Sequence, residues 1–327
     1  MFILLVMTIV TINSCESRKA APAGSTDILH EIDLLTEEEA EEIPVIIEPT
    51  RAELVMRAIM NGYPNRIVKI EYRYDDWAVF LIDAGENPAS VNPAGKWYYY
   101  TGGRLLPEDK KDETSSYRSL QLYNYPGELP VLVERNADER ERLSSMADRR
   151  PSAIARSTFF LDDLFAAATR AEVEKSIVRM NFLGGSIRVH KDIQEALTLV
   201  EARIRAAAAT DRDVQTWINN LGTWEGWNWR NVANSDARSY HAYGLAIDLL
   251  PRSLGGLQTY WLWTAEHRND WYNVPYSQRY HPPQAVVAAF ESYGFIWGGK
   301  WTTFDTMHFE YRPEILFLSG LDVQVLR

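Results

Sequence analysis

Cysteine is almost absent from this chain of 327 residues, in which Cys15 is the single example. One cysteine excludes a disulfide within the chain and a zinc site built from several cysteines. Basic residues are outnumbered, with 34 Lys and Arg against 45 Asp and Glu and a formal net charge of -11. Nucleic acid is therefore not expected as a partner, because like charges repel at the encounter stage.

The N-terminal apolar run is too short to serve as a membrane span. It covers residues 2–12, about the length of a signal-peptide core, whereas a bilayer of roughly 30 Å needs a longer helix. Ile12-Asn13-Ser14-Cys15 resembles a bacterial lipobox, whose cysteine is lipidated and becomes the mature N-terminus. Residues 1–15 are thus predicted to be a signal peptide that ends in a lipidation site at Cys15. An ordinary buried cysteine is the alternative.

This prediction implies an exported protein that is anchored by lipid to a bacterial membrane and faces the periplasm or the cell wall. Which membrane holds the anchor stays open. Residues 16–50 are poor in aromatics and contain the acidic run 37–42, followed by Pro44 and Pro49. Such a composition is typical of a solvated segment, so we interpret 16–50 as an acidic tether. One short acidic helix is the alternative.

Residues 51–135 are predicted to form a small accessory domain rich in β-strands. Alternating segments at 67–72, 77–82 and 97–100 indicate strands, and a helix is expected near 52–60. Gly102-Gly103 and two Asn-Pro pairs mark turns between them. Tyr98, Tyr99 and Tyr100 are either the core of this sheet or a sugar-stacking surface, and the role of the domain is not readable.

Residues 136–327 are predicted to form the main domain. Apolar residues recur at helical spacing over 160–180, 190–209 and 284–292, which predicts helices that cover a sheet. The segment 251–283 is dense in aromatic residues and also holds His267 and His281. It is either packing or a lid or groove wall.

Two histidines have surroundings typical of a metal site. His241 lies in Ser-Tyr-His-Ala-Tyr-Gly-Leu-Ala-Ile-Asp, which ends at Asp248, and His308 lies in Asp-Thr-Met-His-Phe-Glu. A catalytic zinc needs three N or O ligands and one open position. Residues 245–250 and 307–311 have strand character, so neighbouring strands can present Asp248 and His308, while His241 arrives from the preceding loop.

The combination Ser-x-His-x-x-Gly-x-Ala-x-Asp, followed by Asp-x-x-His-Phe-Glu, resembles the zinc peptidases of family M15. This family contains D-alanyl-D-alanine carboxypeptidases and L-alanyl-D-glutamate endopeptidases of peptidoglycan. The resemblance extends over residues 159–313 and includes Trp-Arg-Asn-Val at 229–232 and the segment 295–301. Residues before about 150 are not covered by it.

The resemblance implies roles for individual residues. His241, Asp248 and His308 would hold Zn²⁺, and Asp305 would be the general base that takes a proton from water. Arg230 matches the upstream arginine of the family, which would stabilise the oxyanion or hold a substrate carboxylate.

Three further residues are assigned to substrate or to supporting contacts. Arg238 competes with Arg230 for the arginine role, and either can be an ordinary surface residue. Ser239 is expected to orient the loop or the substrate. Glu310 is expected to support a ligand or contact a substrate amine, with a plain salt bridge as the alternative.

The expected fold is α+β, with a small antiparallel sheet, flanking helices and a zinc cleft, beside the smaller β-rich N-terminal domain. The expected function is zinc-dependent hydrolysis of amide bonds in peptidoglycan stem peptides. A noncatalytic, zinc-containing wall-binding lipoprotein is the alternative, and a zinc phosphoesterase is disfavoured because it needs a richer ligand set. The bond that is cut and the oligomeric state stay open.

Overall fold

The computed structural model describes residues 49–120, 122–148 and 154–325. The described residues belong to one compact unit. The predicted signal peptide, Cys15 and nearly all of the acidic tether lie outside the described residues. Within the described ranges, no helix is both long and apolar enough to cross a membrane.

An antiparallel sheet forms the first part of the described unit. Its strands are, in spatial order, β1 Ile67–Arg73, β2 Asp76–Ile82, β3 Gly95–Tyr99 and β4 Leu106–Pro107. Helix α1, Arg51–Gly62, begins at Thr50, whose side chain accepts a hydrogen bond from Glu53 N. Tyr98 and Tyr99 are 1% and 0% exposed, so these two residues belong to the core. They are not a sugar-stacking surface.

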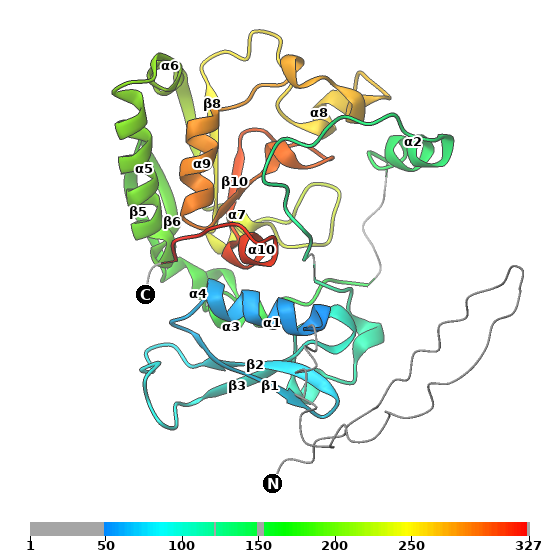
Figure 1. The fold of residues 1–327 in the computed structure, drawn as a ribbon, viewed down its shortest axis with the longest axis vertical. Helices are drawn as coiled ribbons and strands as arrows, with labels where there is room; N and C mark the ends of the chain where they lie inside the picture. Colours follow the sequence, from blue (N-terminus) through cyan, green and yellow to red (C-terminus); the bar gives the residue numbers. More distant parts are fainter. Residues whose placement is uncertain (1–48, 121, 149–153, 326–327) are drawn as a thin grey trace, which may run out of the picture. The chain divides into compact units, whose positions relative to one another are not determined.

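A second antiparallel sheet has the order β7 Leu221–Glu225, β8 Ala246–Pro251, β10 His308–Tyr311 and β9 Phe295–Trp297. Helix α9, Gln284–Ser292, packs on one face, where the ring of Phe290 stacks on Phe309 with centroids 3.8 Å apart. Helix α5, Gln194–Ala208, packs beside α9 on this side of the sheet (Figure 1). The opposite face of β8 and β10 is thereby left for the candidate site.

The remaining elements are the two-stranded sheet β5–β6 and a number of short helices. They are α2 Ala137–Ser144, α3 Phe159–Leu164, α4 Arg170–Glu174, β5 Ile177–Phe182, β6 Gly185–His190, α6 Arg212–Asn220, α7 Tyr240–Tyr243, α8 Trp261–Ala265 and α10 Pro313–Leu318. Short 3-10 helices lie at Thr101–Gly103, Glu108–Lys110, Thr114–Ser116, Lys191–Ile193, Trp271–Asn273, Tyr276–Gln278 and Gly298–Lys300.

The single helix predicted over 160–180 is wrong. Helix α3 ends where Ala166 adopts a φ of 49°, and Thr169 caps the new helix α4 through a capping box. The chain then becomes the hairpin β5–β6, in which Gly184 takes a φ of 90° at the turn. The β-branched Ile177 and Val178 fit the strand better than a helix.

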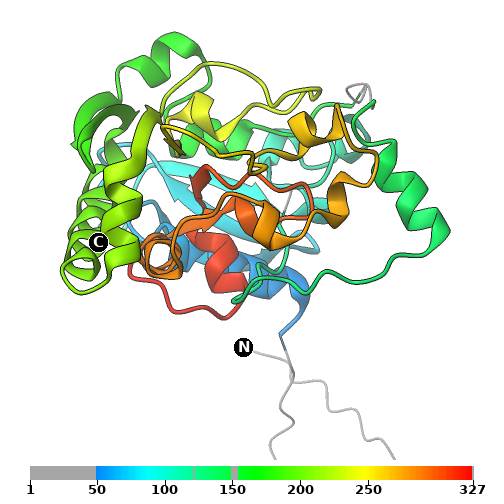
Figure 2. The ribbon, with the colours of Figure 1, turned by 90° about the horizontal axis from the view of Figure 1, so that it is seen from above.

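The α+β class is confirmed by two antiparallel sheets with helices packed against them. Helix α1 lies between the first sheet and α10 (Figure 1), and the Tyr63 hydroxyl after α1 donates a 2.7 Å hydrogen bond to Glu314 of α10. Viewed from above, the cyan sheet lies beneath the orange and red elements (Figure 2). Residues 51–135 and 136–327 thus share one compact unit, and their division into two domains stays a prediction.

Replacing Tyr63 with Phe removes the hydroxyl that links α1 to α10 and nothing else. We expect Tyr63→Phe to lower the free energy of unfolding by about 1–3 kcal/mol, because the buried Glu314 carboxylate loses a donor. Urea unfolding measures this. Tyr72→Phe is the matched control, since Tyr72 is 61% exposed and should change stability by less than about 0.5 kcal/mol. Equal stability of both variants would show that this bond does not stabilise the packing of α1.

Candidate functional site

The pairing of β8 with β10 places two of the predicted ligands side by side. His308 lies opposite Asp248, and Glu310 lies opposite Ala246. Ile247 and Phe309, which alternate with them, are fully buried in the main core. Successive strand residues point to opposite faces, so Asp248, His308 and Glu310 share the face away from α9. All three line a cleft of about 920 Å³.

His241 reaches the same face from the one-turn helix α7. Ser239 caps this helix by accepting a 3.3 Å hydrogen bond from His241 N. The helix ends at Gly244, whose φ of 72° favours glycine. A Cβ at Gly244 would lie 2.7 Å from His190 N, so the chain can turn into β8 here only without a side chain.

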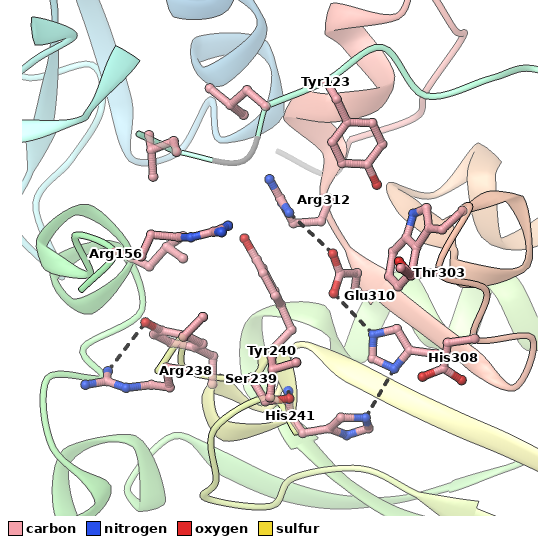
Figure 3. Close-up of a pocket in the computed structure, with 18 of the residues that line it drawn as sticks. Tyr123, Arg156, Arg238, Ser239, Tyr240, His241, Thr303, His308, Glu310 and Arg312 are labelled. Atoms are coloured by element: carbon pink, nitrogen blue, oxygen red, sulfur yellow. Dashed lines mark hydrogen bonds and ion pairs between the residues drawn. The ribbon is translucent and has the colours of Figure 1, made fainter. Parts of the chain in front are cut away.

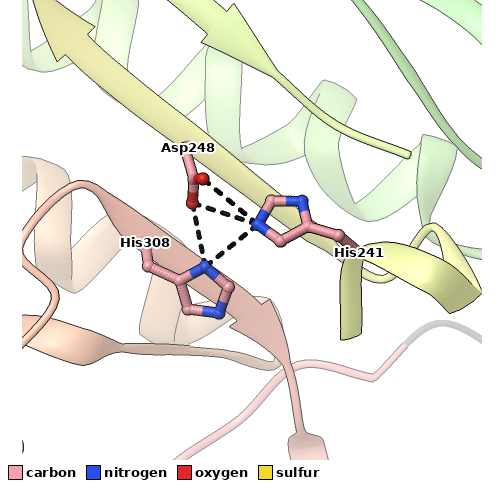
Figure 4. A group of neighbouring side chains, drawn as sticks. All are labelled: His241, Asp248 and His308. Carbon is pink, nitrogen blue, oxygen red and sulfur yellow. Dashed lines mark hydrogen bonds and ion pairs between the residues drawn. The ribbon is translucent and has the colours of Figure 1, made fainter. Parts of the chain in front are cut away.

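The three predicted ligands form a tight cluster (Figure 4). His241 Nε2 lies 3.2 Å from Asp248 Oδ1 and 3.2 Å from His308 Nδ1, and His308 Nδ1 lies 2.8 Å from Asp248 Oδ1. One ligand atom from each residue lies within 4.8 Å of the other two. Two imidazoles and a carboxylate are a donor set that suits a divalent transition metal.

In each imidazole, one nitrogen contacts an oxygen outside the cluster, and this contact leaves the lone pair of the other nitrogen directed into the cluster. His241 Nδ1 lies 2.7 Å from Gly226 O, and His308 Nε2 lies 3.2 Å from Glu310 Oε2. When each outer nitrogen donates to its oxygen, His241 Nε2 and His308 Nδ1 both become acceptors that face Asp248. Three converging acceptors repel one another unless a cation lies among them. The residues therefore fit a metal ion.

The charges of the cluster lead to the same conclusion. Burial alone raises the pKa of Asp248, but His241 and His308 outweigh this effect and hold its pKa well below the usual range. Burial lowers the pKa of His308, yet its hydrogen bonds to Asp248 and Glu310 raise this pKa well above the usual value. The carboxylates of Asp248 and Glu310 thus favour a positive charge among the clustered side chains. Either a proton or a metal ion can supply this charge, and binding of a metal ion would release the proton.

Asp305, the predicted base, lies on the loop that enters β10. Its backbone N–H donates to Gly298 O at 3.0 Å, and Tyr260 forms an isolated bridge with it. Asp305 Oδ1 is buried and has no hydrogen-bond partner among the described residues. Burial raises the pKa of Asp305 to about 7, although the charge of His308 opposes the shift. An unsatisfied carboxylate oxygen in the cleft can accept a proton from a water molecule.

The two candidate arginines differ in the contacts that their guanidinium groups make. Arg238 forms an ion pair with Asp162 and donates to Ala167 O at 2.7 Å, so its guanidinium is held on the scaffold. Arg230 is exposed, lines the cleft and makes one long contact of 3.5 Å with Asn231 O. Its charge also lowers the pKa of Asp305. These contacts favour Arg230 over Arg238 as the residue that can meet a substrate.

Glu310 lies between His308 and Arg312 and contacts both. Its Oε1 accepts a 3.3 Å bond from Arg312 Nη1 on the side away from His308 (Figure 3). Sequence reasoning missed Arg312, although strand alternation after Glu310 indicates it. It also missed Tyr240, which precedes His241, and Arg156, for which no local signal exists. All three line the cleft.

Part of the aromatic segment 251–283 forms a wall of the cleft, and another part is core packing. Tyr260, Trp261 and Trp263 line the cleft and form part of its wall. Trp271 and Tyr272 are instead buried in a separate core cluster. His267 and His281 are not among the residues that line the cleft.

Comparison with protein families supports the recognition of the site. Residues 233–311 match the model of a D-alanyl-D-alanine carboxypeptidase family of the M15 peptidases. This segment contains the three clustered residues and Asp305, and its match supports the assignment to the M15 peptidases. Residues 55–121 match a domain of unknown function, DUF8518. Comparison with curated proteins and with solved structures gave no significant match.

The two arginines should respond differently to removal of their charge. Arg238→Met is expected to lower the free energy of unfolding by about 2–4 kcal/mol, because the largely buried Asp162 loses its partner. Arg230→Met should change it by less than about 0.5 kcal/mol, since Arg230 is exposed. Urea unfolding of both variants measures the difference. If Arg238→Met is as stable as the wild type, Arg238 again becomes a candidate for contact with the substrate.

Proposed function

We propose that the protein is a zinc metallopeptidase that hydrolyses amide bonds in the peptide stems of peptidoglycan, as a D,D-carboxypeptidase or an endopeptidase. The observation that carries this proposal is the convergence of His241, Asp248 and His308 beside a buried, unsatisfied Asp305 oxygen within an M15 segment. His241, Asp248 and His308 are proposed to hold Zn²⁺. When bound, Zn²⁺ supplies Lewis acidity toward the scissile carbonyl and acidifies a water molecule.

Four side chains would carry out the remaining steps of the reaction or support the residues that do. Asp305 accepts a proton from the attacking water at Oδ1 and then gives it to the departing amine. Arg230 donates hydrogen bonds to the oxyanion or to a substrate carboxylate. Glu310 holds the ring orientation of His308, and Ser239 holds helix α7 and with it His241.

The alternative function is a noncatalytic wall-binding lipoprotein that keeps the metal. The buried Asp305 oxygen disfavours this alternative. A buried carboxylate oxygen without a hydrogen-bond partner is costly, and a noncatalytic site gives no reason to keep one next to the cluster. In either case we propose an exported protein, anchored through a lipid on Cys15 and facing the periplasm or the cell wall.

Mass spectrometry of peptidoglycan fragments tests the proposed reaction. Fragments are incubated with the protein loaded with zinc, with the chelator-treated protein and with His308→Ala. We expect a cut only with the zinc-loaded protein, because the chelator-treated protein lacks the metal and His308→Ala lacks one of its ligands. Loss of terminal alanine identifies a carboxypeptidase, and a cut inside the stem identifies an endopeptidase. If one zinc binds per chain but no fragment is cut, the wall-binding function replaces the proposal.

A second variant separates the base from the metal site. We expect Asp305→Asn to keep one zinc per chain, since Asp305 is not in the cluster, and to lower kcat by about 100-fold to 10,000-fold because the base is lost. Metal analysis and steady-state rates measure the two effects. Asp192→Asn is the control and should retain both zinc and rate, because Asp192 is exposed, lies in the short helix after β6 and does not line the cleft. Normal turnover by Asp305→Asn would remove Asp305 from the mechanism.

A further inference from the structure

Tyr125 packs inside the peptidase part of the unit, although it lies outside both family matches. The matched segments are residues 55–121 and 233–311, and Tyr125 lies on the connection between them. Tyr125 is 3% exposed and shares a core cluster with Ile296 of β9 and Ile315 of α10. The connection is therefore anchored in the peptidase part by a side chain to which neither match assigns a role.

The hydroxyl of Tyr125 both donates and accepts a hydrogen bond. It donates to Glu291 Oε1 at 2.5 Å and accepts from Trp297 N at 3.0 Å. The Lys300 ammonium, whose side chain is 0% exposed, donates to the same Glu291 oxygen at 2.6 Å and lies 4.7 Å from the centroid of the Tyr125 ring. A buried lysine and carboxylate are costly alone and tolerable only with such partners. We refer to Tyr125, Glu291, Trp297 and Lys300 as the Tyr125 clamp.

The Tyr125 clamp is joined to the backbone around Asp305. Gly298, which follows Trp297, accepts a 3.0 Å hydrogen bond at its carbonyl oxygen from Asp305 N, and Trp297 Nε1 donates to Thr306 O at 2.8 Å. The two backbones approach so closely that a Cβ at Gly298 would lie 2.5 Å from Asp305 O. The backbone of Asp305 and Thr306 is thus fixed against the residue whose N–H the Tyr125 hydroxyl binds.

The position of the Asp305 carboxylate depends on this backbone. Its buried Oδ1 has no hydrogen-bond partner among the described residues, so no side-chain contact of that kind holds this atom. A displacement of about 1 Å in a catalytic group can cost about 100-fold in rate. Tyr125 does not line the cleft. Its hydroxyl can therefore influence the rate through the position of Asp305 and not through contact with a substrate.

We propose that Tyr125 is a positioning residue for Asp305. Its hydroxyl, with Glu291 and Lys300, fixes the end of β9 and the turn after it, and this turn holds the backbone of Asp305. The inference rests on the proposed function, since it concerns the reaction in which Asp305 is the base. It gives the connection between the two matched segments a part in setting the rate.

Tyr125→Phe tests this inference, because it removes the hydroxyl and keeps the ring. With the fragment that the wild type cuts, we expect zinc-loaded Tyr125→Phe to lower kcat about tenfold, to leave KM within about twofold and to keep one zinc per chain. Tyr280→Phe is the matched control. Tyr280 is 7% exposed, accepts a 2.8 Å hydrogen bond from Trp217 Nε1 and does not line the cleft, so its loss should leave kcat within about twofold.

A double-mutant cycle distinguishes positioning of the base from a general loss of structure. In Asp305→Asn the base is absent, so adding Tyr125→Phe should change the remaining kcat by less than about twofold. The inference is overturned if Tyr125→Phe keeps the full kcat, if it lowers kcat about tenfold without Asp305 as well, or if Tyr280→Phe loses as much. Should Tyr125→Phe not fold, Glu291→Gln replaces it with the same expected outcomes, because a neutral amide accepts weaker hydrogen bonds than a carboxylate.

Hydrogen exchange keeps this inference separable from the proposed reaction, since it needs no substrate. The amide of Asp305 is bonded to Gly298 O, and we expect Tyr125→Phe to speed its exchange about tenfold, measured by NMR. Tyr280→Phe should leave it within about twofold. Faster exchange in Tyr125→Phe alone supports the clamp, even if the wild type cuts no fragment and the proposed reaction fails. Unchanged exchange, or the same change in both variants, would show that Tyr125 does not position Asp305.

Discussion

The antiparallel pairing of β8 with β10 is the constraint on which the site depends. The register sets His308 opposite Asp248, and it turns Ile247 and Phe309 into the core at the same time. A slip of one residue would exchange the two faces and bury the polar side chains among aromatic rings. The stacked contact between Phe290 and Phe309 therefore supports the cluster of His241, Asp248 and His308 from the other side of the sheet.

A chain of buried polar contacts extends from this pairing to the N-terminal part of the unit. His308 contacts Glu310, Glu310 contacts Arg312, and Arg312 contacts Glu314, which accepts the hydroxyl of Tyr63. Each of these charges is costly to bury alone and tolerable only with its partners. The first sheet and α1 are consequently linked to the site by polar as well as apolar contacts. This arrangement gives the DUF8518 segment a structural connection to the peptidase segment.

The acidic balance of the whole chain is not repeated in the cleft, which is lined by arginines as well as carboxylates. The chain carries a formal charge of -11, yet arginines on several elements line the cleft. Because the local field depends on the nearest charges, an acidic protein can still attract an anionic peptide to one place. The positive residues that line the cleft are distributed over the chain at 156, 230, 238, 300 and 312, so no basic run in the sequence indicates them.

The sequence by itself determined the local parts of this site. The two histidine motifs, the strand character around Asp248 and His308, and the glycine turn at Gly244 depend on neighbours within ten residues, and the M15 match followed from them. The helix expected over 160–180 failed because its apolar spacing suits a helix and a hairpin alike, and pairing with β6 decided between them.

Only the tertiary structure decided which arginine is held on the scaffold and which residues complete the cleft. Arg238 meets Asp162 across 76 positions of the chain, and Arg156 reaches the cleft from a segment without a motif. Such contacts depend on the packing of distant elements, whereas sequence patterns report the order along a single strand or helix.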